Sequence, residues 1–86
     1  MYNKDELVQL MVRKLERKPA GYETTVCDII NEILSPEEFD FTIEDLFEID
    51  SKFRSEVIKQ GMLLDSMKHD LNPGLPFDMS FVLRKV

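Results

Sequence analysis

The sequence is poor in the residues that build covalent, metal and cofactor sites. Its 86 residues include one cysteine, one histidine and no tryptophan. One cysteine cannot form an intramolecular disulfide or a cysteine-based zinc site. A single histidine leaves no Cys-His-Asn set to activate a nucleophile, and no glycine-rich phosphate loop or hydrolase pattern is present. We therefore expect no metal, no cofactor and no enzymatic activity.

The single histidine and the single cysteine are both expected to have structural and not chemical roles. His69 lies near Asp65 and Asp70, but a metal pair at positions i and i+4 needs a helix, and we expect a loop here. Cys27 lies beside an apolar stripe, and a free cysteine usually packs as a small hydrophobe. Neither residue is therefore a candidate site.

Long apolar runs are also missing. No run approaches the roughly 18 residues that a membrane span needs, and residues 1–6 lack the apolar core of a secretory signal. Three glycines and four prolines leave no low-complexity linker. We expect a cytoplasmic protein with no membrane partner and a single domain over residues 1–86, divided into N-terminal helices over 1–34 and a second part over 35–86.

Positive charge is absent from the middle of the chain. The net charge is −6, and residues 23–50 hold ten acids and no base, whereas residues 1–22 and 51–86 each carry a net charge of +2. Such a block is either a solvated face or an acidic surface that binds a basic partner. The candidate protein-binding residues in it are Glu37, Glu38, Glu44, Asp45 and Glu48.

Two N-terminal helices are indicated, over residues 4–17 and 26–34. Each combines an apolar stripe of helical period with a cap signature, which is Asn3 with Glu6 and then Thr25 with Asp28. The first helix ends in a basic run that compensates the helix dipole, or contacts phosphate or a second copy. This run is Arg13, Lys14, Arg17 and Lys18.

The centre of the chain predicts short elements. Residues 35–38 favour a helical turn, and the alternation over 39–41 favours a very short strand. We expect two helices over 43–49 and 52–60, because the Asp50-Ser51 pair can cap the second one. A single helix over 43–60 is the alternative.

The pattern of the C-terminal part predicts a β-hairpin with a long loop. Strands are expected over 62–68 and 77–84, and the turn residues Asn72-Pro73-Gly74 lie in the loop over 69–76. The buried face of the second strand should be Phe77, Met79, Phe81 and Leu83. The fold class is therefore α+β, helix-rich and ending in a β-hairpin.

One contiguous core should join these elements. Its expected members are Ile29, Ile30, Ile33, Leu46, Phe53 and Val57. On this assignment the substitution Ile33→Ala costs about 2–5 kcal/mol.

From Phe39 onward the expected order is strand, helix, turn, helix, strand, long loop and strand. This order resembles the winged helix-turn-helix superfamily, with 69–76 as the wing and 52–60 as the recognition helix. The resemblance implies that the two N-terminal helices support the winged-helix part and supply a homodimer face. The candidate nucleic-acid-binding residues are Lys52, Arg54, Ser55, Lys59 and Lys68, because such side chains contact phosphates and base edges. The acids of the preceding helix would repel the same backbone.

A second, local resemblance lies in the middle of the chain. Phe41-Thr-Ile-Glu-Asp-Leu-Phe47, followed by Phe53, Val57 and Gly61, is similar to part of a family of small uncharacterised bacterial proteins from Gram-positive species. The resemblance implies no function.

Two functions from different classes follow. The first is a small non-enzymatic module that binds a protein partner, expected to be basic, through the acidic surface of residues 23–50; an acidic mimic of DNA is a special case of it. The alternative is a winged-helix nucleic-acid-binding or transcription-associated protein that uses the 52–60 helix. The acidic charge of residues 23–50 favours the protein-binding function. The expected order of the elements favours the nucleic-acid-binding function.

Overall fold

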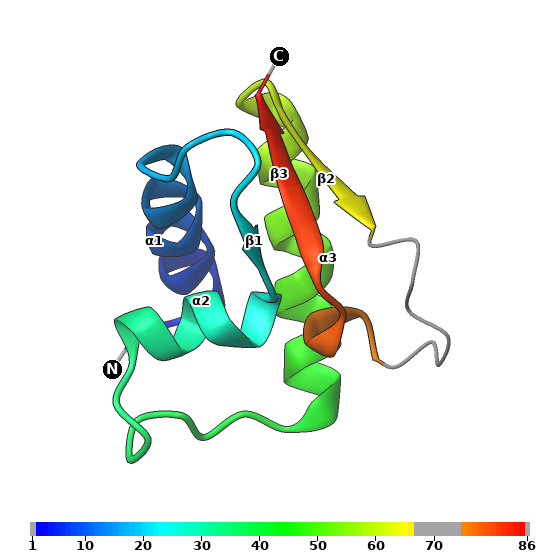
Figure 1. The fold of residues 1–86 in the computed structure, drawn as a ribbon. Helices are drawn as coiled ribbons and strands as arrows, with labels where there is room; N and C mark the ends of the chain where they lie inside the picture. Colours follow the sequence, from blue (N-terminus) through cyan, green and yellow to red (C-terminus); the bar gives the residue numbers. More distant parts are fainter. Residues whose placement is uncertain (1, 67–74, 86) are drawn as a thin grey trace.

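Three α-helices and a three-stranded antiparallel sheet form an α+β fold in the part of the chain that the computed structural model describes, residues 2–66 and 75–85 (Figure 1). The predicted fold class is confirmed. The elements in chain order are α1 (Lys4–Glu16), β1 (Glu23–Thr24), α2 (Val26–Ile33), α3 (Ile43–Lys59), β2 (Met62–Ser66), the 3-10 turn η1 (Pro76–Asp78) and β3 (Phe81–Lys85).

The two N-terminal helices begin where their cap signatures predict. The Asn3 side chain accepts a hydrogen bond from the Glu6 N–H at 2.8 Å, and the Thr25 hydroxyl accepts one from the Asp28 N–H at 3.0 Å. Each bond satisfies a backbone donor that has no partner inside the first turn of a helix. Both predicted helices are confirmed, and each ends one residue earlier than expected.

The predicted break within residues 43–60 is wrong, because α3 is one continuous helix of 17 residues. A capping box between Thr42 and Asp45 starts it. Asp50 is buried, and its carboxylate accepts hydrogen bonds from Arg54 Nε, one turn further along, at 3.1 Å. The Asp50 side chain therefore binds within the helix instead of capping a new one. The turn expected between the two shorter helices does not form.

The segment over 35–41 begins with the predicted helical turn, because the N–H groups of Glu38 and Phe39 both donate to the Ser35 carbonyl. It continues as an irregular link, so the predicted strand over 39–41 is wrong. The N–H and hydroxyl of Ser35 both donate to the Glu38 carboxylate, which closes the turn. Phe39 and Phe41 are half-buried and pack edge to face, with ring centroids 5.6 Å apart. Packing of both rings against the core explains their alternation without a strand.

The sheet has the order β1-β3-β2. The predicted antiparallel pairing is confirmed, since β2 and β3 align from Met62 opposite Lys85 to Ser66 opposite Phe81. The predicted strand over 77–84 starts only at Phe81, because Pro76 opens a 3-10 turn. Residues 67–68 of the predicted first strand, and 69–74 of the predicted loop, lie outside the described residues. The two-residue strand β1 was not predicted.

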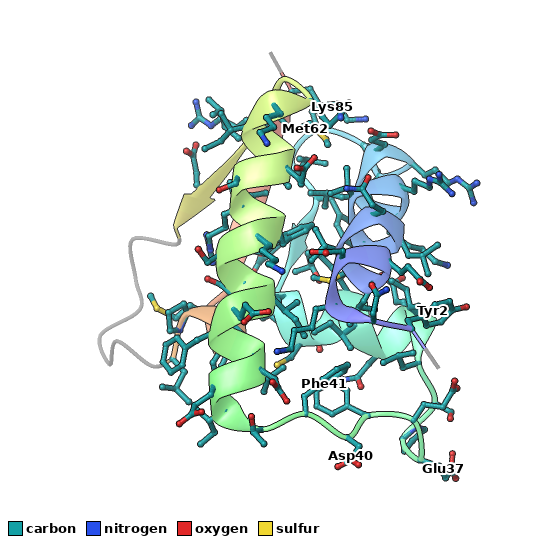
Figure 2. All side chains as sticks on the ribbon, turned by 180° about the vertical axis from the view of Figure 1, so that it is seen from behind. Tyr2, Glu37, Asp40, Phe41, Met62 and Lys85 are labelled. Atoms are coloured by element: carbon teal, nitrogen blue, oxygen red, sulfur yellow. The ribbon has the colours of Figure 1, made fainter. Side chains whose placement is uncertain are left out.

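The core lies between the helices and the inner face of the sheet, with α3 behind the strands and α1 beside it (Figures 1 and 2). Phe53 of α3 and Phe81 of β3 meet at its centre, with ring centroids 6.5 Å apart. Five of the six predicted core residues are buried, and Ile33 is only half-buried. The strand-helix-helix-strand-strand order expected from Phe39 begins instead at β1, so α2 takes the place of the helix predicted over 43–49.

This burial pattern predicts unequal costs for two truncations. Phe53→Ala should lower the free energy of unfolding by about 3–5 kcal/mol, because it leaves a cavity in the core. Ile33→Ala should cost clearly less, since the side chain already contacts solvent. Urea unfolding of both variants measures the difference. Equal losses would show that α2 is as deeply buried through Ile33 as α3 is through Phe53.

Candidate functional site

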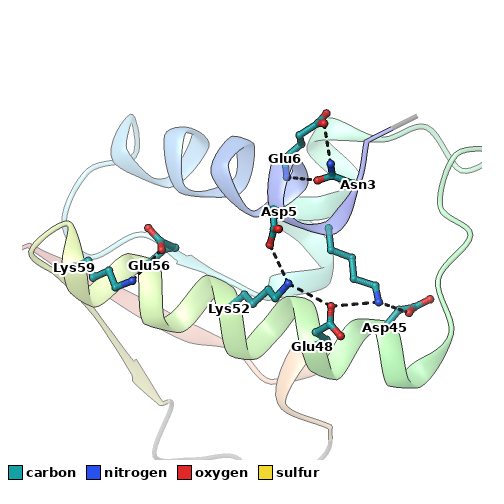
Figure 3. A network of polar contacts seen from close by, with 9 residues as sticks. Asn3, Asp5, Glu6, Asp45, Glu48, Lys52, Glu56 and Lys59 are labelled. Atoms are coloured by element: carbon teal, nitrogen blue, oxygen red, sulfur yellow. Dashed lines mark hydrogen bonds and ion pairs between the residues drawn. The ribbon is translucent and has the colours of Figure 1, made fainter.

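Three of the four basic side chains expected to contact nucleic acid, those of Lys52, Arg54 and Lys59, lie on α3, and each forms an ion pair with a carboxylate of the same chain. Lys52 Nζ lies 2.9 Å from Asp5 of α1 and 3.5 Å from Glu48, one turn earlier (Figure 3). Lys59 Nζ lies 3.4 Å from Glu56. Both lysines remain exposed, as does Ser55. A phosphate would have to compete with these carboxylates for each ammonium group.

Lys68, the fifth residue of that predicted set, lies outside the described residues. Arg54, by contrast, is part of the packing. Its guanidinium binds the buried Asp50, donates to the Pro76 carbonyl at 3.3 Å and lies 5.9 Å from the centre of the Phe81 ring. These contacts connect α3 to η1 and β3. Arg54 is therefore positioned as a structural residue, and a phosphate contact would remove it from these partners.

A second group of ion pairs joins the start of α1 to α3. Lys4 Nζ lies 2.9 Å from Asp45 and 3.3 Å from Glu48, and Figure 3 shows that Glu48 also reaches Lys52. The hydrogen bond from Lys4 lowers the pKa of Asp45, and the Thr42 N–H adds to the effect. The hydrogen bonds that Lys4 donates to Asp45 and Glu48 raise the pKa of Lys4. The hydrogen bond to Asp5 likewise raises the pKa of Lys52. These pairs are exposed to solvent, so salt screens them.

The five acids predicted as protein-binding residues divide into two groups. Glu38, Asp45 and Glu48 have partners within the chain, as described above. Glu37 and Glu44 are exposed and have no ion-pair partner among the described residues. Asp40, which lies between them in the sequence, is likewise exposed without such a partner. We call Glu37, Asp40 and Glu44 the acidic end.

Figure 2 shows how this acidic end is presented. The link between α2 and α3 crosses one end of the molecule, and Glu37 and Asp40 project from it away from the body. Phe41, by contrast, points back toward the helices. The link is thus held by its aromatic residues, while its carboxylates reach solvent.

Two large apolar side chains are exposed on the first two turns of α3, which also carry Glu44, and neither was predicted as a site residue. Ile43 is 59% exposed and Phe47 is 43% exposed. They lie one turn apart on α3, and the Phe47 ring packs edge to face on Phe77 at 5.3 Å. The signal was present in the sequence, because both positions lie off the helix stripe formed by Leu46, Ile49, Phe53 and Val57.

Among the described residues, the Cys27 thiol, the possible metal ligands and the basic run do not form a further candidate site. Burial raises the pKa of the Cys27 thiol to about 11, and the negative charge of Asp78 adds to the effect, so the thiol is protonated at neutral pH. No group of three potential metal ligands occurs within residues 2–66 and 75–85. In the basic run, Lys18 binds Glu32 at 3.0 Å and lies over the Tyr22 ring.

Comparison with known proteins adds no assignment. The chain matches no protein-family model, no curated protein and no solved structure. Among the helices that the structure describes, none has the length and apolar character needed to cross a bilayer.

The Lys4–Asp45 contact predicts a specific pH dependence. The folded state lowers the pKa of Asp45 below its ordinary value of 3.8. The carboxylate therefore stabilises the fold above that value, and the contribution is lost as pH falls through the folded pKa. Asp45→Asn should be less stable than the parent near pH 6, and the difference should shrink below pH 3.8.

Chemical denaturation over this pH range measures the effect. Asp40→Asn is the matched control, since Asp40 is exposed without an ion pair in the described part of the chain. It should change the free energy of unfolding by less than about 0.5 kcal/mol throughout. A constant difference between Asp45→Asn and the parent at every pH would contradict the ion-pair interpretation.

Proposed function

We propose that this protein is a small non-enzymatic binding module whose working surface is the acidic end together with Ile43 and Phe47. The partner is a protein that offers basic side chains beside apolar ones. The observation that carries the proposal is the combination of exposed carboxylates with an exposed aromatic ring and an exposed isoleucine, all at the N-terminal end of α3 and the link before it.

Apolar anchors with a polar rim are typical of protein interfaces. Aromatic residues are enriched at the centres of such interfaces, where they supply most of the binding energy. Phe47 suits this role because packing on Phe77 holds its ring in place while leaving 43% of the side chain exposed. Charged groups at the rim speed the encounter and select the partner.

The charges of the site favour a basic partner. Glu37, Asp40 and Glu44 have no cation of the described chain to neutralise them, whereas the nearby Asp45 and Glu48 are paired with Lys4. A partner with lysine or arginine side chains would therefore gain contacts without breaking existing pairs. Nucleic acid, which carries about one negative charge per 1.7 Å of helix axis, would be repelled by this end.

The order of the elements favours a second candidate. The sequence β1-α2-α3-β2-β3 and the sheet order β1-β3-β2 resemble a winged helix-turn-helix, with α3 as the recognition helix. In that function Lys52, Ser55 and Lys59 would face the groove. The intramolecular pairs of both lysines weigh against it, and so does the nine-residue segment of residues 34–42 where a short turn would be expected.

Two of the three carboxylates of the acidic end, Glu37 and Glu44, allow a matched test. The probe is a synthetic peptide that alternates leucine with lysine, titrated into the isotope-labelled chain and followed by NMR. The double variant E37Q/E44Q should weaken binding about tenfold or more, because each substitution removes a rim charge. The double variant E16Q/E23Q removes two exposed charges elsewhere, and it should weaken binding much less.

A third variant separates charge from packing. Phe47→Ser leaves the net charge unchanged and should also weaken binding about tenfold or more. Shifted resonances should cluster at residues 37–47. Equal weakening by both double variants, with no effect of Phe47→Ser, would show a response to net charge alone and would reject the proposed surface.

A further inference from the structure

Strand β2 forms one edge of the sheet. The hydrogen bonds that β3 makes on its opposite side, toward β1, determine which backbone N–H and C=O groups of β2 point to that edge. The Leu83 carbonyl accepts a hydrogen bond from the Gly21 N–H at 2.8 Å, and the Leu83 N–H donates to the Tyr22 carbonyl at 2.8 Å. The backbone groups of Leu83 therefore face the β1 side of the sheet. Successive residues of a strand point these groups in opposite directions.

This alternation determines which groups of β2 are unpaired. Val82 and Arg84, the neighbours of Leu83, direct their N–H and C=O groups toward β2, where they align with Asp65 and Leu63. Leu63 and Asp65 are thus bonded to β3. Leu64 directs its N–H and C=O to the outer edge, where no strand lies beside β2 in the described part of the chain (Figure 1).

The surface along this edge is apolar. Ile58 of α3 is 65% exposed and lies in a shallow groove of about 210 Å³ beside the strand. The groove is lined by Arg54, Val57, Ile58, Leu63, Leu64 and Asp65. Natural sheets usually protect an edge with charged side chains, above all lysine, or with proline or a bulge. Residues 62–66 contain neither a lysine nor a proline, and their one charged residue, Asp65, is paired with Arg84.

The charges beside the edge are neutralised in pairs. Asp65 binds Arg84, and Arg54 binds Asp50. Lys59 binds Glu56. The acidic end lies at the opposite end of α3 from Ile58. A second chain of the same net charge of −6 can therefore approach this edge without facing unpaired carboxylates.

We propose that β2 pairs with β2 of a second copy of this chain, antiparallel and across a twofold axis. Leu64 then lies opposite Leu64 of the second copy, and Met62 lies opposite Ser66 of the second copy. This register uses the outward-facing backbone groups of all three residues, because hydrogen-bonded positions recur at every second residue. It is self-complementary, as a twofold interface requires. The result is a six-stranded sheet in which the exposed Ile58 side chains of both copies approach each other.

Amide exchange at Leu64 tests the pairing directly. Residue-resolved hydrogen exchange and light scattering are measured on the full chain over about a hundredfold range of concentration. The Leu64 amide should exchange at least about tenfold more slowly at the highest concentration, in step with the appearance of dimer. The Leu63 and Asp65 amides, which are bonded to β3, should be protected at every concentration. A monomer at all concentrations would overturn the proposal, and so would a dimer in which the Leu64 amide stays unprotected.

Two substitutions at one exposed position test the register. The pairing places Leu63 opposite Asp65 of the second copy, and like charges in directly opposed positions are destabilising. Leu63→Asp should raise the dimer dissociation constant about tenfold. Leu63→Lys should raise it much less, because the lysine faces that aspartate. Circular dichroism checks that both variants fold. Equal weakening by the two charges would reject this register.

Discussion

The contact between the Asp50 carboxylate and the Arg54 guanidinium joins three elements of the fold around a buried charge. It lies within one turn of α3, and Asp50 is buried. Arg54 extends the contact to the Pro76 carbonyl and the Phe81 ring, so the helix, the 3-10 turn and the central strand are held by one side chain. A buried carboxylate left without this partner would be strongly destabilising. The pair thus lies inside the continuous helix α3 and connects it to η1 and β3.

A continuous α3 determines what each part of its surface can do. One side of the helix contacts α1, and there Lys52 is paired with Asp5, while Lys4 of α1 is paired with Asp45 and Glu48. An external anion would therefore have to compete with carboxylates of the chain for Lys4 and Lys52. The N-terminal end presents Glu44 and the exposed Ile43 and Phe47, which are available to a partner. The distribution of paired and unpaired charge therefore supports protein binding more than nucleic-acid binding.

Local signals predicted the helix starts well, because a capping residue and its donor are three positions apart. The cap signal at Asp50 and Ser51 failed because Asp50 is buried and binds Arg54 one turn further along. The other partners of Arg54, the Pro76 carbonyl and the Phe81 ring, are distant in sequence. The alternation of Phe39 and Phe41 arises from packing on the core and not from a strand. β1 has two residues, too few for a periodic pattern.

The candidate site was predicted in part. The acidic character of the 23–50 stretch is visible in the sequence, but the distinction between Glu44 and its paired neighbour Asp45 depends on where Lys4 lies in space. Ile43 and Phe47 were overlooked because an apolar residue on a helix is usually assigned to the core. Arg54 was grouped with the exposed cations because its buried partner one turn away could not be recognised from charge alone.

We propose that the cations of α3 serve the fold and not a nucleic acid. A fluorescence anisotropy titration of the full chain with a mixed-sequence DNA duplex, at about 50 mM salt, tests it most directly, since low salt favours phosphate contacts. We expect no saturable binding up to about 100 μM protein, the weak end of non-specific DNA affinity. Micromolar binding that Lys59→Ala weakens, with a salt slope reduced by about one unit, would contradict it.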